Sequence, residues 1–215
     1  EAMAGTKVDA LYVLGGEAVG DALPLDSLLG DPLAEQVPVD LDDVVVLPSG
    51  LASKIESIDT ADGPVDEAFA PMSVTIRLAD DVDVSRGDII AHAEKAPAIA
   101  DQVAARLIWF DEEPMLPGRS YALKCGCQTT TATISSLKYK LNVDNLEHVA
   151  GKTLELNEVG SCNLSTGKAL VFDPYAENSE TGSFILIDRS THGTVAAGMI
   201  EFGLRRATNI QWQAL

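Results

Sequence analysis

The strongest constraint on the fold is a pair of apolar segments close together near the end of the chain. Residues 184–187 and 194–200 are separated by the polar loop 188–193. The first segment has no polar alternation, which is typical of a strand covered on both faces. Turn-forming residues flank it. The pattern predicts a β-hairpin, in which the small residues at 196–198 suit a close approach of another backbone, as at the seam of a barrel.

The two faces of the first segment lead to a hypothesis about an interaction surface. Successive strand residues point to opposite sides, so Phe184 and Leu186 share one face while Ile185 and Ile187 share the other. One pair should pack inward and the other against a second domain or subunit. The sequence does not decide which pair is which. In the loop, Arg189 is expected to form an ion pair at the strand end, and the candidate interface comprises Ile185, Ile187, Arg189 and His192.

Short apolar segments separated by turn residues occur along most of the chain before this hairpin. In the second half they are expected as strands at residues 106–110, 121–127, 131–142, 153–163 and 169–172. Earlier strands are expected at residues 44–47, 53–58, 73–78 and 89–91. This spacing predicts a mainly β fold of two consecutive antiparallel β-barrels, the first of them incomplete.

The expected domains follow from changes in composition. Residues 1–43 form an unassigned acidic lead-in, 44–96 a partial barrel, 104–203 a second barrel and 204–215 a tail. The lead-in contains a possible strand at 8–14 and a possible short helix at 25–33.

Two helical turns are expected between the strands. The connector that starts at Pro97 and ends at Ala104 is rich in alanine, which favours a helical turn. Asp144 followed by Glu147 matches a capping box, which predicts one helical turn at 145–149.

The charge and cysteine content exclude several classes of function. The chain carries a formal net charge of -18, and such acidity repels the phosphates of nucleic acids. No apolar run approaches the ~18 residues of a membrane-spanning helix. Three cysteines in a chain of 215 residues favour a reduced, cytoplasmic protein over a disulfide framework.

No pattern in the sequence predicts catalysis or metal binding. Cys125 and Cys127 are expected on one face of a strand as buried structural thiols, because zinc-ligand spacing is absent. The acidic residues at 80–83 fit a solvated turn better than a metal site. The chain contains no phosphate-binding P-loop motif and no nucleophile elbow. The residues by themselves therefore indicate a binding or assembly module.

Several longer stretches resemble one family. They read VVVLPSG at 44–50, DVSRGDII at 83–90, LIWFDEEPMLPGRSYALK at 107–124, NVDNLEHVAGKTLELNEVGSCNLS at 142–165 and DPYAENSETGSFILIDRSTHGTVAAGMI at 173–200. They resemble the C-terminal half of the large, GTP-hydrolysing subunit of bacterial sulfate adenylyltransferase, an elongation-factor-like GTPase. The tail at 202–215 looks like the join to an adenylylsulfate kinase domain in fused versions.

This resemblance implies a non-catalytic role for the chain. In the family, a GTPase domain precedes two β-barrels, and the subunit pairs with a small catalytic subunit that makes adenylylsulfate from ATP and sulfate. Residues 1–42 do not match the GTPase domain. The resemblance therefore implies that GTP, ATP and Mg bind only to the complete complex, and it assigns no catalytic, cofactor or metal residue to this chain.

Two alternatives remain open at this point. The chain could be a two-barrel binding or assembly module related to translation GTPases, although an RNA-contacting barrel should show a basic face. Residues 7–16 also have a faint similarity to molybdopterin-type oxidoreductases, but no cofactor ligands accompany it.

Overall fold

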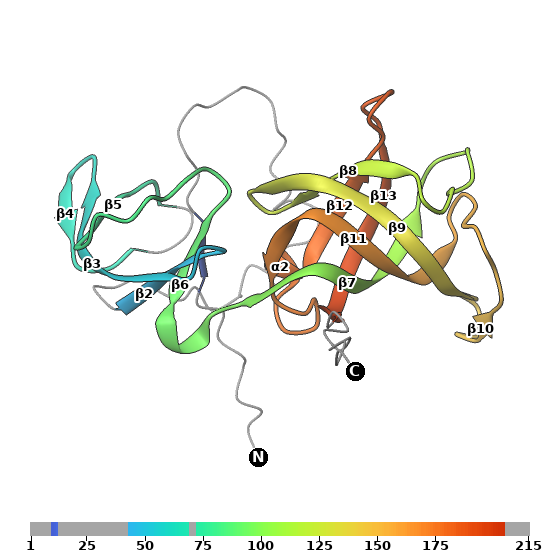
Figure 1. Ribbon diagram of the computed structural model, residues 1–215, viewed down its shortest axis with the longest axis horizontal. Coiled ribbons are helices and arrows are strands. Elements are labelled where there is room, and N and C mark those ends of the chain that lie inside the picture. Colours follow the sequence, from blue (N-terminus) through green and yellow to red (C-terminus); the bar gives the residue numbers. More distant parts are fainter. Residues whose placement is uncertain (1–9, 13–42, 69–71, 205–215) are drawn as a thin grey trace, which may run out of the picture. The chain divides into compact units, whose positions relative to one another are not determined.

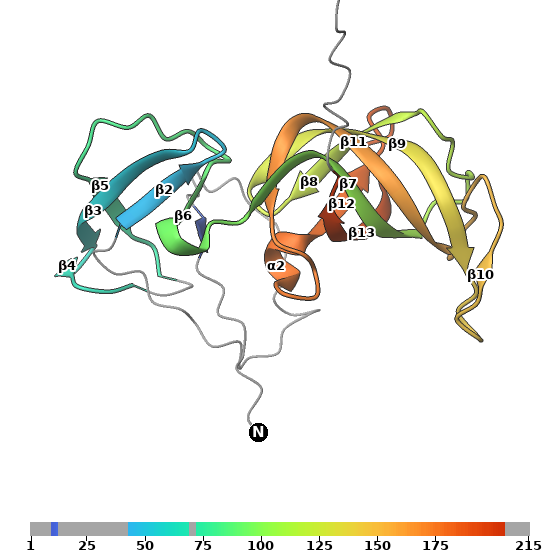
Figure 2. The same cartoon turned by 60° about the horizontal axis from the view of Figure 1, so that its bottom comes forward.

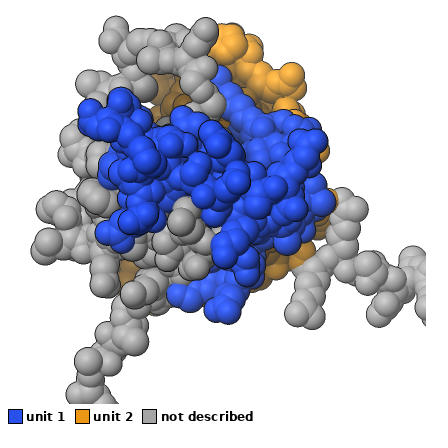
Figure 3. Space-filling model, turned by 90° about the vertical axis from the view of Figure 1, so that its left-hand side faces the viewer, with its two compact units in different colours: residues 1–97 blue, residues 98–215 orange. Residues whose placement is uncertain are grey.

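The computed structural model describes residues 10–12, 43–68 and 72–204 of the chain. It consists of two compact units, Glu1–Pro97 and Ala98–Leu215, which are coloured separately in Figure 3. Strands dominate both units (Figure 1). In the described part of the chain, no helix has the length and apolar character that crossing a membrane requires.

The first unit is an open antiparallel sheet. Its elements are β1 (Ala10–Tyr12), β2 (Asp43–Leu47), β3 (Leu51–Thr60), β4 (Gly63–Val65), β5 (Thr75–Leu78), β6 (Ile89–His92) and the short helix η1 (Ala93–Lys95). The strand order is β1-β6-β2-β3-β4, with β5 paired to β3. Among the described residues the sheet does not close on itself, which confirms the prediction of an incomplete first barrel. The strand expected at 8–14 is β1, whereas the helix expected at 25–33 lies outside the described residues.

A β-bulge shapes the core of the first unit. Ile55 and Ile58 lie three residues apart on β3, so a regular strand would point them to opposite faces. The pairing of β3 with β5 shifts register between Ile55 and Ser57, and this extra residue lets both isoleucines enter the core. They are 1% and 0% exposed, and they pack with Val44, Val46 and Ile90.

The second unit is a closed barrel. Its elements are β7 (Ala98–Trp109), β8 (Ser120–Cys125), β9 (Gln128–Leu141), β10 (His148–Val149), β11 (Val159–Phe172), α2 (Ser179–Gly182), β12 (Ser183–Ile187) and β13 (Thr194–Gly203). The strand order is β10-β9-β11-β7-β13-β12-β8, and β8 pairs back to β9. The six longer strands thus form a ring to which β10 adds at β9, as Figures 1 and 2 show. The predicted mainly β fold is confirmed.

The expected helical connector before the second barrel is wrong. Residues 98–104 belong to β7, which pairs with β11 on one side and β13 on the other. Ala104 and Ala105 are fully buried between these neighbours. The weak helix preference of alanine is overridden because a central strand satisfies its backbone on both sides.

The helical turn expected at 145–149 is also wrong. The side-chain Oδ1 of Asn145 accepts a hydrogen bond from the backbone N–H of Glu147 at 3.1 Å, and Leu146 N–H donates to the carbonyl of Asn142 at 2.8 Å. Asparagine competes with helix formation in this way by binding nearby backbone groups. The chain turns back and forms β10 against β9 instead.

Strand β11 differs from the two separate strands expected at 153–163 and 169–172. It begins at Val159 and continues to Phe172, with an irregularity in its pairing to β7 between Ser165 and Leu170. A bulge allows one long strand to bend around the barrel where the sequence suggested a break.

The closing hairpin forms as expected, with a clear inside and outside. Phe184 and Leu186 are 3% and 0% exposed in the barrel core, whereas Ile185 and Ile187 are half-buried on the outer face. The expected close backbone approach is wrong, because the space beside Gly198 is occupied by the Phe184 ring. A Cβ atom at Gly198 would lie 2.1 Å from Cζ of Phe184. The hairpin does lie at the seam of the barrel, because β13, the last strand, pairs with β7, the first.

Cys125 and Cys127 do not share a strand face. Gly126 and Cys127 form the two-residue turn between β8 and β9, and Gly126 has a positive φ of 53°. Such turns require left-handed backbone, which glycine adopts readily. Cys125 and Cys162 lie in the barrel core, where burial raises the pKa of both thiols to about 12.

We predict that one thiol of the native chain reacts with Ellman's reagent at pH 8. Raising a thiol pKa lowers the thiolate fraction at a given pH, so buried Cys125 and Cys162 should react only after unfolding in guanidinium. Cys127 is half-buried and should supply the fast reaction, which Cys127→Ser removes. Equal rates for all three thiols would contradict this assignment.

We predict that Gly198→Ala destabilises the second barrel by about 1–3 kcal/mol, because the new methyl group overlaps the Phe184 ring. The measurement is thermal melting followed by circular dichroism. Gly193→Ala in the adjacent loop is the matched control, since its nearest neighbour would be Thr191 Oγ1 at 3.4 Å. Identical melting temperatures for the two variants would show that the barrel relaxes around the ring.

Candidate interaction surface on the second barrel

The outer face of β12 carries the two apolar candidates. Register places Ile185 opposite Ala197 of β13 and Lys124 of β8, and Ile187 opposite Ala122 of β8. Both isoleucines are half-buried. The structure therefore brings Ile185 and Ile187 together on one outward surface. Ala197 extends this apolar surface onto β13.

The same register extends this apolar surface across the barrel. Ala197 lies opposite Ile108 of β7, Ile108 opposite Val159 of β11, and Val159 opposite Leu141 of β9. We call the five residues Ile185, Ala197, Ile108, Val159 and Leu141 the outer apolar row. All five are half-buried. Neighbouring strands are about 4.8 Å apart, so these side chains form one continuous stripe over five strands.

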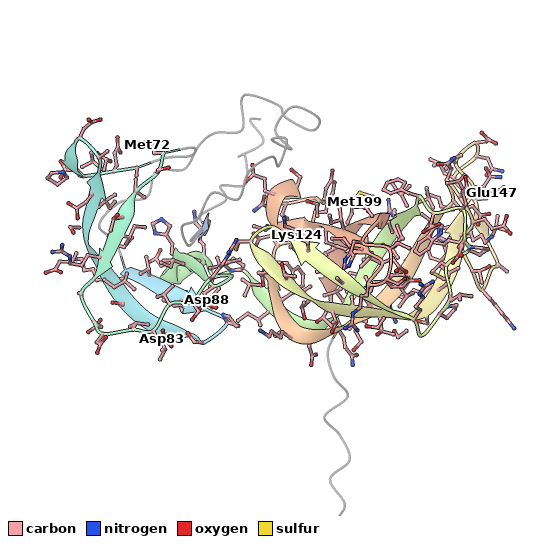
Figure 4. All side chains as sticks on the ribbon, turned by 90° about the horizontal axis from the view of Figure 1, so that it is seen from above. Met72, Asp83, Asp88, Lys124, Glu147 and Met199 are labelled. Atoms are coloured by element: carbon pink, nitrogen blue, oxygen red, sulfur yellow. The ribbon has the colours of Figure 1, made fainter. Side chains whose placement is uncertain are left out.

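Charged side chains lie at two places along the border of the stripe. Lys124 of β8 is exposed beside Ile185, and it is opposite Thr129 of β9. Arg106 of β7 lies opposite Met199 of β13, and its guanidinium donates to the Glu201 carboxylate at 2.8 Å. Lys124 and Met199 are labelled in Figure 4. An apolar centre within a polar rim is the usual anatomy of a protein–protein interface.

A small hollow lies at the β9 end of the row. Its volume is about 200 Å³, and its lining consists of Arg106, Tyr139, Leu141, Leu146, His148 and Ser161. The rings of Tyr139 and His148 stack with centroids 3.7 Å apart. Ligand pockets usually measure about 300–1,000 Å³, so this hollow suits a single side chain better than a nucleotide.

The other two candidates lie in the turn that follows β12. Arg189 and His192 are exposed, and His192 has a positive φ of 59°. The ion pair expected for Arg189 is not observed among the described residues, because Arg119 instead forms an ion pair with Asp188. Arg119 also lies 3.8 Å from Glu113 and 5.7 Å from the centre of the Tyr121 ring.

Asp188 anchors this turn. It is 4% exposed and accepts hydrogen bonds from the hydroxyl of Ser190 and from the backbone N–H groups of Ser190 and Thr191, the latter two at 2.7 and 3.1 Å. These bonds, with the Arg119 charge in a smaller role, hold the pKa of Asp188 down to about 2. The carboxylate therefore stays charged at neutral pH and fixes the loop next to the outer apolar row.

The described residues contain no group of three His, Cys, Asp or Glu side chains that could hold a metal ion. Sequence reasoning found Ile185 and Ile187 but missed Ile108, Val159 and Leu141, because only the strand pairing reveals that they are neighbours. The pairing of Arg119 with Asp188 was missed for the same reason, since 69 residues separate them.

Comparison with known folds agrees with the barrel architecture. The chain matches a structure of sup35 complexed with GDP with a TM-score of 0.69 and 18% identity, covering 78% of this chain and 42% of that chain. It matches apo translation elongation factor SelB from Methanococcus maripaludis with a TM-score of 0.61 and 18% identity, covering 79% of this chain and 38% of that chain. At this identity the likeness shows the fold alone.

Sequence relatives are considerably closer. The bifunctional enzyme NodQ of Rhizobium sp. (strain N33) is 49% identical over 174 residues, which is 81% of this chain and 27% of that protein. The bifunctional enzyme CysN/CysC of Xylella fastidiosa (strain Temecula1 / ATCC 700964) is 45% identical over 174 residues, with 81% and 28% covered. The chain thus spans little more than a quarter of the length of these relatives.

A family model gives the same result for the second barrel. The model described as GTP-eEF1A C-terminal domain-like matches residues 102–201. Together with the relatives, this match confirms the resemblance found in the sequence. Residues 102–201, which make up most of the second barrel, match the GTP-eEF1A C-terminal domain-like family, and 174 residues of the chain are similar to part of the bifunctional NodQ and CysN/CysC enzymes.

Proposed function

We propose that this chain is the non-catalytic barrel region of a GTP-dependent sulfate adenylyltransferase large subunit. In this role it supports the synthesis of adenylylsulfate from ATP and sulfate during sulfate assimilation in the cytoplasm. The observation that carries the proposal is the 49% identity to NodQ and 45% identity to CysN/CysC over 174 residues. Neither barrel fold nor charge would lead to this substrate class by itself.

The proposed chemistry lies on other parts of the assembly. GTP and its Mg would bind a GTPase domain upstream, ATP and sulfate would bind a small catalytic subunit, and an adenylylsulfate kinase domain would follow downstream. The absence of a P-loop motif from the sequence supports this division, because a P-loop lysine and backbone cradle hold the phosphates in such GTPases.

The outer apolar row is the proposed contact surface for a neighbouring domain or subunit. The barrel core is complete without it, since the inward pair Phe184 and Leu186 already packs inside. Apolar side chains that the core does not use are available for association. The anchored turn with Arg189 and His192 would border this contact.

A two-barrel module that binds RNA, as in translation factors, fits less well. Phosphate contacts depend on Lys and Arg, and the net charge here is -18. The solved structures of sup35 and of translation elongation factor SelB share the fold at 18% identity, which supports the architecture of the chain and not its partner.

We predict that the purified chain does not bind GTP. Fluorescently labelled GTP with Mg should give no anisotropy change at micromolar protein, because the phosphates have no cationic cradle. A full-length CysN/CysC enzyme is the positive control. Micromolar binding by this chain would place a nucleotide site on it and overturn the division of roles.

We predict different outcomes for the two faces of β12. Phe184→Ala and Leu186→Ala should each lower the free energy of unfolding by ~2–5 kcal/mol, because both side chains fill the core. Ile185→Ser combined with Ile187→Ser should change the melting temperature little but weaken binding to the purified small catalytic subunit about tenfold or more. Calorimetric titration measures the affinity. If the inward and outward pairs destabilise the chain equally and binding to the small subunit is unchanged, both faces of β12 belong to the core and the interface hypothesis fails.

A further inference from the structure

The β9–β10 hairpin is an appendage of the second barrel. Strand β10, His148–Val149, pairs only with Lys140 and Leu141 of β9 and takes no part in barrel closure. The hairpin extends beyond the other strands in Figures 1 and 2. Its base is held by the stack of His148 on Tyr139. The barrel therefore does not need the tip of this hairpin for its own stability.

The tip exposes apolar side chains. Val143, Leu146 and Val149 are 63%, 69% and 46% exposed. Leu146 has the highest exposure of any large hydrophobic residue in the described part of the chain. An exposed apolar cluster on a protruding element is typical of a site that a partner covers.

Leu146 also occupies an unfavourable backbone conformation. It has a φ of 59°, and the other described non-glycine residues with positive φ are Asn157 and His192. Asparagine and histidine are enriched in this region, whereas a bulky aliphatic residue is an outlier there. Glycine or asparagine would fit this turn with less strain. The exposed leucine therefore contributes little to folding at this position, which is expected of a residue that contacts a partner.

The charges around Leu146 indicate what kind of partner fits. Asp144 and Glu147 are both exposed, and the Glu147 carboxylate accepts a hydrogen bond from Asn145 Nδ2 at 2.9 Å. Among the described residues, neither carboxylate forms an ion pair with Lys or Arg. Glu147 lies at one end of the second unit in Figure 4. The tip is thus an apolar knob between two unpaired negative charges.

We propose that Val143, Leu146 and Val149 insert into an apolar pocket of the small catalytic subunit, bordered by Lys or Arg side chains that pair with Asp144 and Glu147. This inference rests on the proposed function. Charge complementarity favours a protein surface with Lys or Arg side chains, because nucleic acids and anionic lipids repel the carboxylates. The proposed function makes the small catalytic subunit that partner. A second copy of this chain also fits poorly, since each copy has a net charge of -18. The hollow beside Leu146 continues the contact toward the outer apolar row.

The test is Leu146→Gly in the whole chain, with calorimetric titration against the purified small catalytic subunit and with thermal melting. Glycine removes the knob and relieves the left-handed strain. The melting temperature should rise by about 2–6 °C, while the dissociation constant should increase about tenfold or more. Asn157→Gly is the matched control, because it changes another exposed residue with a positive φ of 64°, and it should leave the affinity unchanged.

A second variant tests the charges separately. Asp144→Asn combined with Glu147→Gln should weaken binding about fivefold or more at 50 mM salt, and the difference should largely disappear at 500 mM salt because screening removes the attraction.

Four results would overturn the inference, and they are distinguishable. If the wild-type chain does not bind the small subunit, the proposed pairing fails and this surface with it. If Leu146→Gly binds within twofold of wild type, the pairing stands but the tip is not the contact. If Leu146→Gly lowers the melting temperature and the affinity together, Leu146 has a structural role. If sedimentation shows wild-type self-association that Leu146→Gly abolishes, the occupant is a second copy.

Discussion

The pairing of β13 with β7 is the contact on which the second unit depends. It brings the last strand of the barrel against the first and completes a ring in which each barrel strand has two neighbours, so that no long edge stays unpaired. Closure also forces the inward side chains into a small volume. Gly198 beneath Phe184 and the buried Ala104 and Ala105 are consequences, because larger residues would not fit. The first unit lacks such a closing pair among its described strands.

A closed barrel leaves its outer face free for other uses. The core is filled from inside, so an outward apolar residue is covered only in part by its cross-strand neighbours. The outer apolar row and the exposed tip at Leu146 are two such features, since both leave apolar side chains in contact with water unless a partner covers them. The Asp188 turn and the Tyr139–His148 stack hold the borders of this surface in place. Rigid borders reduce the conformational entropy that is lost on association.

The relatives and the site contribute different kinds of support. Identity of 45–49% to CysN/CysC and NodQ supports the proposed substrate class, which no local feature of a β-barrel could indicate. The geometry of the second barrel instead supports the proposed kind of contact, in which apolar side chains meet a partner. This chain spans about a quarter of the length of those relatives.

Local patterns in the sequence were sufficient for the mainly β fold, the incomplete first barrel, the closing hairpin and the resemblance to the large subunit. These depend on alternation, turn residues and short motifs, which act within a few positions of the chain. Tertiary pairing decided the rest. It turned the alanine-rich connector into β7, replaced the expected helical turn near Asn145 with a hydrogen-bonded turn and β10, and put Phe184 inside and Ile185 outside. Inside and outside depend on register, and register is determined by strands far apart in the sequence and by bulges that shift it by one residue. For the same reason Ile108, Val159 and Leu141 become neighbours, and Arg119 reaches Asp188, only when the barrel closes.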